Sequence, residues 1–141
     1  MQRNGNKTEA TIIRTAGGRV HEILRTLLVL SAVGNLGQKG TIVVIHHTDC
    51  GLQTATDEGI RTVLGESAAA SKDDEDEDEE EVEKVLKGMK FGSFEDPEVS
   101  VREDVEFLRE SVFFRGMSVV GCVMDTETGS VRVVEVGGGG P

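Results

Sequence analysis

The pattern of apolar and polar positions divides this chain into short segments of two kinds. Residues 41–45, 117–124 and 131–136 are apolar runs rich in Val and Ile, and runs of that kind predict strands. Residues 11–14 are also rich in β-branched side chains and predict a further short strand. The last two runs flank the turn-forming residues 125–129, so we expect them to pair as an antiparallel hairpin.

Apolar positions spaced three or four residues apart predict helices between these strands. The clearest helix covers residues 20–33 and ends at the glycine-rich segment 34–37. We expect further helices over 56–64 and 82–89, and one that begins at Pro97. The helix after Pro97 carries a set of positions that give it a charged face: Arg102, Glu103, Asp104, Glu106 and Arg109.

The order of these elements indicates an α/β fold. A strand over 11–14, a helix over 20–33 and a strand over 41–45 have the spacing of a βαβ unit with parallel strands. We therefore expect a mostly parallel sheet of about four strands, flanked by helices and closed by the antiparallel C-terminal hairpin. A chain of 141 residues suits one domain, which we place at residues 11–136. Residues 1–10 are expected to be disordered and residues 137–141 to form a flexible tail.

Charge changes this picture in one place. The formal net charge is −11, and residues 73–81 supply nine of the negative charges. Residues 67–81 are small or acidic, which predicts a disordered insertion in the domain. The acidic balance argues against nucleic acid or an anionic membrane surface as a partner. No apolar run has the length of a bilayer span, so we expect a cytoplasmic protein.

Candidate chemistry gathers at the end of the strand over 41–45. His47 and Cys50 follow this strand closely, and open α/β sheets place their ligand sites at such strand ends. Imidazole and thiolate are donors that zinc prefers, although a catalytic zinc usually has three protein ligands. Asp49 lies between the two and can orient a neighbouring group, whereas His46 should point to the other face of the strand. Two alternatives stay open: a strand end without a metal, and a Cys50 thiol nucleophile assisted by His47.

A second candidate is the glycine pair between residues 11–14 and the first helix. Gly17 and Gly18 bring backbone N–H groups to the start of a helix, which can form a cradle for an anion. Arg14 could face the same crevice. The alternative is a structural turn beside a surface arginine.

Taken together, four motifs resemble the β-class carbonic anhydrase family. They occur in the family's order at residues 14–18, 24–27, 47–51 and 121–129, and read RTAGG, LRTL, HTDCG and GCVMDTETG. The resemblance implies the fold expected above, with Zn2+ bound by His47 and Cys50 and a role for Asp49 beside the metal. It also implies Arg14, Gly17 and Gly18 in a substrate or anion loop.

The function implied by this resemblance is the reversible hydration of carbon dioxide to bicarbonate. A zinc-bound hydroxide performs that reaction in the family, and its members form homo-oligomers such as dimers and tetramers. The chain departs from the family in one respect that matters. The family's Cys-x-Asp-x-Arg motif supplies the third zinc ligand ahead of the RTAGG segment, and none of the thirteen residues before Arg14 is a cysteine.

We therefore expect an N-terminally truncated or degenerate member of the family. Thr15 also stands where the family usually has Asn. The alternative function is a catalytically degenerate relative that acts as a binding or regulatory subunit.

Overall fold

The fold is a mixed α/β arrangement, as the sequence predicts. The computed structural model describes residues 10–33, 40–71 and 77–137. In these ranges three strands form one sheet in the order β1-β2-β3, with β1 at Thr41–His47, β2 at Ser118–Met124 and β3 at Val131–Val134. β1 pairs with β2 in parallel, and β2 pairs with β3 antiparallel, which confirms the C-terminal hairpin.

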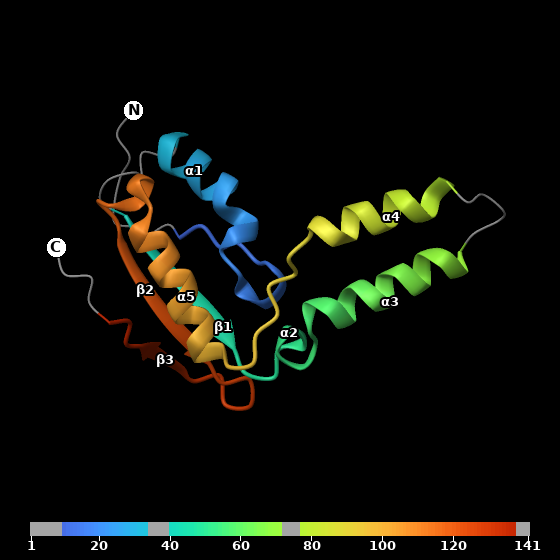
Figure 1. The fold of residues 1–141 in the computed structure, drawn as a ribbon. Helices are drawn as coiled ribbons and strands as arrows, with labels where there is room; N and C mark the ends of the chain where they lie inside the picture. Colours follow the sequence, from blue (N-terminus) through green and yellow to red (C-terminus); the bar gives the residue numbers. More distant parts are fainter. Residues whose placement is uncertain (1–9, 34–39, 72–76, 138–141) are drawn as a thin grey trace.

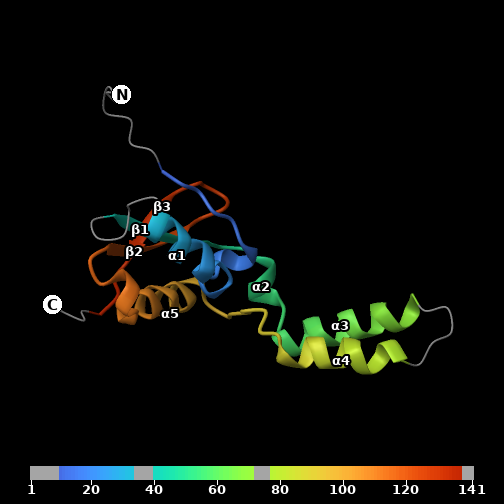
Figure 2. The same ribbon diagram turned by 90° about the horizontal axis from the view of Figure 1, so that it is seen from above.

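One helix covers the middle of the sheet. Helix α5 (Pro97–Glu110) begins as its sequence indicates, with Pro97 in the first turn and Asp96 accepting a hydrogen bond from the Glu98 N–H at 2.8 Å. Its buried apolar positions follow helical spacing and belong to the core that the helix forms with the strands. Figures 1 and 2 show α5 lying along one face of the sheet, and it contacts β1 and β2. The core of the described residues contains Val20, Val44, Val101, Val105, Leu108, Phe114, Val119, Val123 and Val134. Phe114 comes from a short 3-10 helix, η3 (Val112–Phe114), that follows α5.

The first predicted helix exists and starts with a 3-10 turn. This turn, η2 (His21–Ile23), leads into α1 (Leu24–Val33), whose partly buried Leu24, Leu27 and Leu28 pack against the same core as α5. The predicted stop over 34–37 lies outside the described residues. No helix in the described ranges is long and apolar enough to cross a membrane.

The other face of the sheet carries exposed apolar side chains. Val43 is 52% exposed, Ile45 is 46% exposed and Val133 is 67% exposed. Their neighbours in the same strands, Val44 and Val134, point toward α5 and are buried. The strand over 41–45 is therefore buried on one face only, because successive side chains alternate across a sheet.

The expected strand over residues 11–14 is wrong. These residues have no strand partner in the described structure, and Ile12 is 81% exposed. The predicted βαβ unit fails with it, because the parallel partner of β1 is β2, which follows more than 70 positions later in the chain. The described sheet consequently has three strands, rather than about four, and β1 lies at its edge.

Two helices form an arm that extends away from the sheet (Figures 1 and 2). They are α3 (Asp57–Ala70) and α4 (Glu77–Gly88), and they pack against each other. The expected helices over 56–64 and 82–89 are thus both longer than the pattern indicates. Residues 67–70 and 77–81, which we expected to be disordered, are helical, since Ala and Glu favour helix strongly. Residues 72–76 lie outside the described ranges, as do 1–9 and 138–141.

The core contact between α5 and β2 requires glycine at position 121. A Cβ built on Gly121 lies 2.4 Å from Val101 Cγ1 and 3.0 Å from Val105 Cγ2. We expect Gly121→Ala to lower the free energy of unfolding by about 1–3 kcal/mol, because the extra methyl overpacks the core. Urea denaturation measures this loss. Gly137→Ala is the control, since nothing lies within 4 Å of its added Cβ, and equal losses in both variants would contradict the packing argument.

The base of the arm depends on an ionised carboxylate. Asp57 accepts hydrogen bonds from Ser93 Oγ at 2.7 Å and from the backbone N–H groups of Ser93 and Phe91, both at 3.0 Å. The Ser93 hydroxyl, followed by these backbone donors, holds the pKa of Asp57 below its ordinary value of 3.8, against the opposing effect of desolvation.

Asp57 should therefore make arm stability depend on pH. The pKa of Asp57 is lower in the folded state than in the unfolded state. Its contribution to the free energy of unfolding is therefore complete at a pH above the unfolded-state pKa, and it is lost as the pH falls through the folded-state pKa. We expect Asp57→Asn to cost about 1 kcal/mol near neutral pH and to remove this acid sensitivity. Urea unfolding followed by circular dichroism between about pH 7 and about pH 2 measures both effects. Glu58→Gln is the control, and retained acid sensitivity in Asp57→Asn would count against the assignment.

Candidate functional site

His47 and Cys50 lie on one tight turn at the end of β1. The Thr48 N–H donates to the Met124 carbonyl at 3.0 Å, which continues the pairing with β2 just beyond His47. The chain then reverses at Asp49, whose φ of +54° is unusual for a residue other than glycine. Cys50 directly precedes the four-residue helix α2 (Gly51–Thr54). His47 is half-buried, and Cys50 is buried with 5% exposure.

The ring of His47 is oriented by its own turn. Its Nδ1 lies 2.7 Å from the Thr48 carbonyl oxygen, which can only accept a hydrogen bond. Nδ1 therefore carries the proton, and in the neutral ring Nε2 keeps a free lone pair. Histidines that bind metals are commonly fixed in this way, with the second nitrogen bonded to a carbonyl or carboxylate.

Asp49 joins the site turn to the hairpin turn between β2 and β3. Its carboxylate is exposed and accepts a hydrogen bond from Thr126 Oγ1 at 3.2 Å. The Thr126 N–H also donates to Thr48 Oγ1 at 3.0 Å. The sequence did not single out Thr48 or Thr126, although parallel strands bring their C-terminal ends together and residues just beyond β1 and β2 could have been paired on that ground. A role for Asp49 in catalysis stays a prediction.

Gly17 and Gly18 lie against the segment that carries His47 and Cys50. They end the 3-10 turn η1 (Ala16–Gly18), with φ values of +62° and +70°. A Cβ on Gly17 would approach Leu52 Cδ1 to 2.8 Å, and one on Gly18 would approach both His46 Cδ2 and the Ile45 carbonyl oxygen to 2.7 Å. The loop therefore packs against residues that precede the site turn in the chain and against one that follows it. A side chain at either glycine would not fit.

Arg14 does not take part in the packing of the glycine loop. Its side chain is exposed, and within the described residues it makes no hydrogen bond or ion pair. Its expected contribution to an anion loop stays a prediction. Arg19, on the other side of the glycines, instead bonds the Ser100 carbonyl and pairs with Glu103 and Asp104 on α5.

His46 points to the opposite face from His47, as the alternation of strand side chains predicts. It has no exposed surface, and it contacts Ser100 and Asp104 of α5, which are also fully buried. The expected charged face of this helix is therefore wrong for Asp104, which lies on the buried face. Helical spacing explains the error: Ser100 and Asp104 adjoin the buried Val101 and Val105, so they share the face that meets the sheet. The spacing of Ser100 and Asp104, four residues apart and next to Val101 and Val105, could have predicted that both are buried.

The donors fit zinc in kind and fall short in number. His47 and Cys50 offer imidazole and thiol, yet no group of three His, Cys, Asp or Glu side chains in the described ranges could hold a metal ion. Cys122, the other cysteine, is 6% exposed within β2. A thiol nucleophile gains no support from the geometry, because no hydrogen bond joins Cys50 to His47 among these residues.

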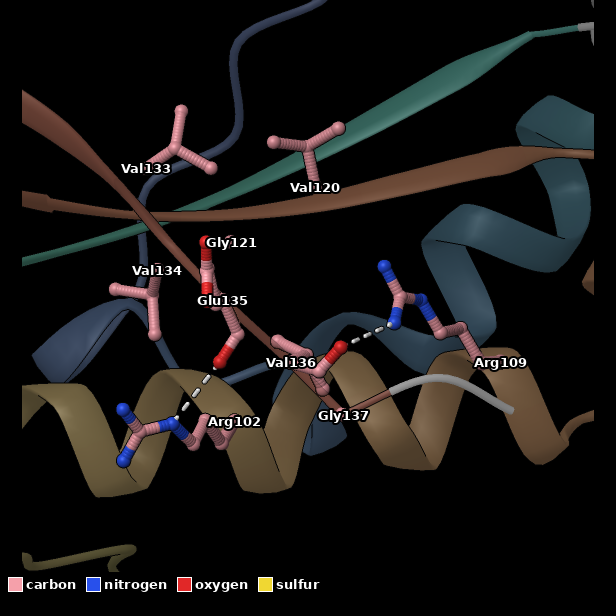
Figure 3. Close-up of a pocket in the computed structure, with 9 residues that line it drawn as sticks. All are labelled: Arg102, Arg109, Val120, Gly121, Val133, Val134, Glu135, Val136 and Gly137. Carbon is pink, nitrogen blue, oxygen red and sulfur yellow. Dashed lines mark hydrogen bonds between the residues drawn. The ribbon is translucent and has the colours of Figure 1, made fainter. Parts of the chain in front are cut away.

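A cavity of about 660 Å³ is lined by other residues than those of this turn. Figure 3 shows the residues that line it. It opens between α5 and the end of β3, and none of the predicted site residues lines it. Arg102 donates to the Glu135 carbonyl at 3.2 Å, and Arg109 donates to the carbonyls of Val136 and Val119 at 3.5 and 2.9 Å. These arginines satisfy backbone acceptors at the sheet margin, so the cavity is separate from the candidate site.

Comparison with known proteins gives a consistent group of relatives. No protein-family model matches the chain. The chain is 26% identical to carbon disulfide hydrolase of Acidithiobacillus thiooxidans over 135 residues, and the match covers 91% of this chain and 65% of the relative.

Two solved structures agree in sequence and in fold. A carbonic anhydrase from Streptococcus mutans is 32% identical, with a TM-score of 0.66 over 85% of this chain and 63% of its own. A carbonic anhydrase from Glaciozyma antarctica is 27% identical, with a TM-score of 0.70 over 87% of this chain and 66% of its own. This chain thus spans about two thirds of the length of each relative.

The close packing of Gly18 makes it a test of the site's architecture. We expect Gly18→Ala to lower the free energy of unfolding by about 2–4 kcal/mol, from the left-handed backbone and the clash with His46 and the Ile45 carbonyl. Denaturant titration measures the loss. Gly129→Ala is the matched control, because its φ is +72° and nothing lies within 4 Å of the added Cβ. The argument fails if the two variants lose equal stability.

Proposed function

We propose, on the premise that this chain is a relative of the β-carbonic anhydrases in sequence and in fold, that it is a carbonic anhydrase-like zinc protein. The family reaction is the reversible hydration of carbon dioxide to bicarbonate. The observation that carries the proposal is the turn at the end of β1, where the free Nε2 of His47 and the Cys50 thiol belong to the same short segment. His47 and Cys50 would hold the ion. Bound zinc supplies the acidity that makes water a nucleophile near neutral pH.

The remaining site residues orient these two donors. The Thr48 carbonyl fixes the tautomer of His47, and Thr126 holds the Asp49 carboxylate beside the turn. Gly17 and Gly18 lie against Leu52 and His46, which adjoin the turn in the chain, at positions where a Cβ would not fit. We propose that Asp49 handles a proton or orients a ligand there, and that Arg14 attracts an anion to the loop.

The missing third donor supports a second candidate. Zinc affinity rises with each ligand, so a site with two protein donors should bind the ion more weakly than a complete one. The described residues offer no third donor. A catalytically degenerate relative that acts as a binding or regulatory subunit is therefore the alternative function, and metal stoichiometry distinguishes it from an enzyme.

The substrate class we propose is a small linear heteroallene. Carbon dioxide and carbon disulfide share a central electrophilic carbon, and the relatives include both carbonic anhydrases and a carbon disulfide hydrolase. An assay of this chain should therefore offer both compounds.

We also propose a homo-oligomer, such as a dimer or tetramer. Support comes from the exposed apolar face of the sheet, which includes Val43, Ile45, Val131 and Val133. A contiguous apolar surface of this kind is typical of protein interfaces. The expected cytoplasmic location stays a prediction, as does the absence of nucleic acid and membrane partners.

Metal binding is the direct test of the donor assignment. We expect the purified chain to bind Cd2+, a spectroscopic substitute for zinc, with a thiolate charge-transfer band in the ultraviolet. Cys50→Ser should abolish the band, and His47→Ala should weaken the affinity at least about tenfold, because one of two donors is lost. Cys122→Ser is the matched control and should leave the band unchanged.

Activity then separates the two candidate functions. Hydration of carbon dioxide, or hydrolysis of carbon disulfide, that requires zinc and is lost in His47→Ala would support the enzyme. Zinc binding without turnover of either compound would support the regulatory subunit. A Cd2+ band that persists in Cys50→Ser and disappears in Cys122→Ser would contradict the site itself.

A further inference from the structure

Three fully buried polar side chains connect β1, α5 and the glycine loop. They are His46 on β1 and Ser100 and Asp104 on α5, each with no exposed surface. His46 Nδ1 lies 2.6 Å from Ser100 Oγ, and His46 Nε2 lies 3.2 Å both from the Gly18 carbonyl oxygen and from Asp104 Oδ2. Buried polar groups are costly unless they are bonded, so this set is a specific feature of the fold.

The contacts fix the direction of one hydrogen bond. The Gly18 carbonyl oxygen can only accept, so Nε2 of His46 carries a proton and donates to it. The same N–H faces Asp104 Oδ2, which also accepts from the Val20 backbone N–H at 3.1 Å. His46 therefore bonds the carbonyl of Gly18, and Asp104 bonds the N–H of Val20.

Arg19 completes this attachment of the loop. Its guanidinium lies 3.3 Å from Glu103 Oε2 and 3.3 Å from Asp104 Oδ1. That buried oxygen has no hydrogen-bond partner among the described residues, so the ion pair with Arg19 is its polar contact. The glycine loop is thus bound to α5 on one side. Gly18 also lies next to the Ile45 carbonyl, and Gly17 lies next to Leu52. Ile45 and Leu52 flank His47 and Cys50 in the chain.

We propose that His46 is a positioning residue that locks the Gly17–Gly18 loop onto the turn carrying His47 and Cys50, through the Nε2 bond to the Gly18 carbonyl. Its consequence for metal binding rests on the proposed function, whereas the loop contact itself does not. The three side chains also include the residue types of a Ser-His-Asp hydrolase triad. Complete burial of all three excludes that role, because no substrate can reach Ser100 Oγ.

Two amide substitutions separate the two ring nitrogens of His46. The side-chain nitrogen of glutamine reaches approximately the place of Nε2, and that of asparagine approximately the place of Nδ1. His46→Gln should therefore keep the donor to Gly18, and His46→Asn should lose it. Both variants remove the ring and its packing against Phe94. Asparagine is one methylene shorter and leaves the larger cavity, so the general loss of stability is removed by comparison with core amides of β2.

Hydrogen exchange of backbone amides is the measurement. We expect exchange at Gly18 and Val20 to be about tenfold faster in His46→Asn than in His46→Gln, after scaling to core amides of β2, since one buried hydrogen bond is lost. Equal exchange in the two variants, or faster exchange in His46→Gln, would overturn the proposal.

A second variant keeps the test decisive if neither substitution at position 46 folds. Asp104→Asn preserves the shape of the side chain and removes its charge from Arg19 and His46. We expect the Val20 amide to exchange faster in this variant and to be unchanged in Glu106→Gln, which removes one charge from an exposed position of the same helix. The same Val20 exchange rate in both would contradict the proposal.

Cd2+ affinity links the loop to the site. It should fall several-fold in His46→Asn and be restored in His46→Gln, because the loop packs on the turn that carries the donors. A wild-type chain without a Cd2+ band would refute the proposed zinc function, and amide exchange would still decide whether His46 positions the loop.

Discussion

The packing of α5 on the parallel pair β1 and β2 is the contact on which the rest of this structure depends. Gly121 allows it, since Val101 and Val105 occupy the space that a Cβ would need. The close approach also brings Ser100 and Asp104 to the strand, where they meet His46. The apolar contact supplies most of the stabilisation, because buried area contributes in proportion to its extent. The polar set adds specificity, since the contacts of His46 with Ser100, Asp104 and the Gly18 carbonyl form only in this arrangement.

The candidate site follows from that arrangement on the opposite face of β1. Alternation of side chains sends His46 into the core and His47 outward, so one strand carries both a core histidine and the candidate site histidine. The turn at Asp49 then brings Cys50 to the same strand end, and Thr126 fastens it to the hairpin. Within the described residues β1 is an edge strand and has a strand neighbour on one side only. The result is a strand end that carries the imidazole of His47 and the thiol of Cys50 close together in the chain.

The arm shows that acidic composition alone is a poor guide to disorder. Residues 67–70 and 77–81 are helical despite their small or acidic character. Arg61 donates to the carbonyls of Leu86 and Met89, at 3.0 and 2.6 Å, and so joins α3 to the end of α4. Asp57 anchors the base through Ser93 and Phe91. These contacts join residues 25 to 36 positions apart, which no local pattern of charge reveals.

The sequence by itself determined the α/β class, the hairpin, the helix after Pro97, and the motif with His47 and Cys50. Each of these depends on local periodicity or on turn chemistry, which residues a few positions apart specify. Only the tertiary structure decided that residues 11–14 join no strand of the described sheet, that Asp104 is buried, and that His46 contacts the Gly18 carbonyl. The reason is physical: hydrogen bonding and burial of these residues depend on partners 28 to 84 positions away, and the packing of α5 on the sheet chooses those partners.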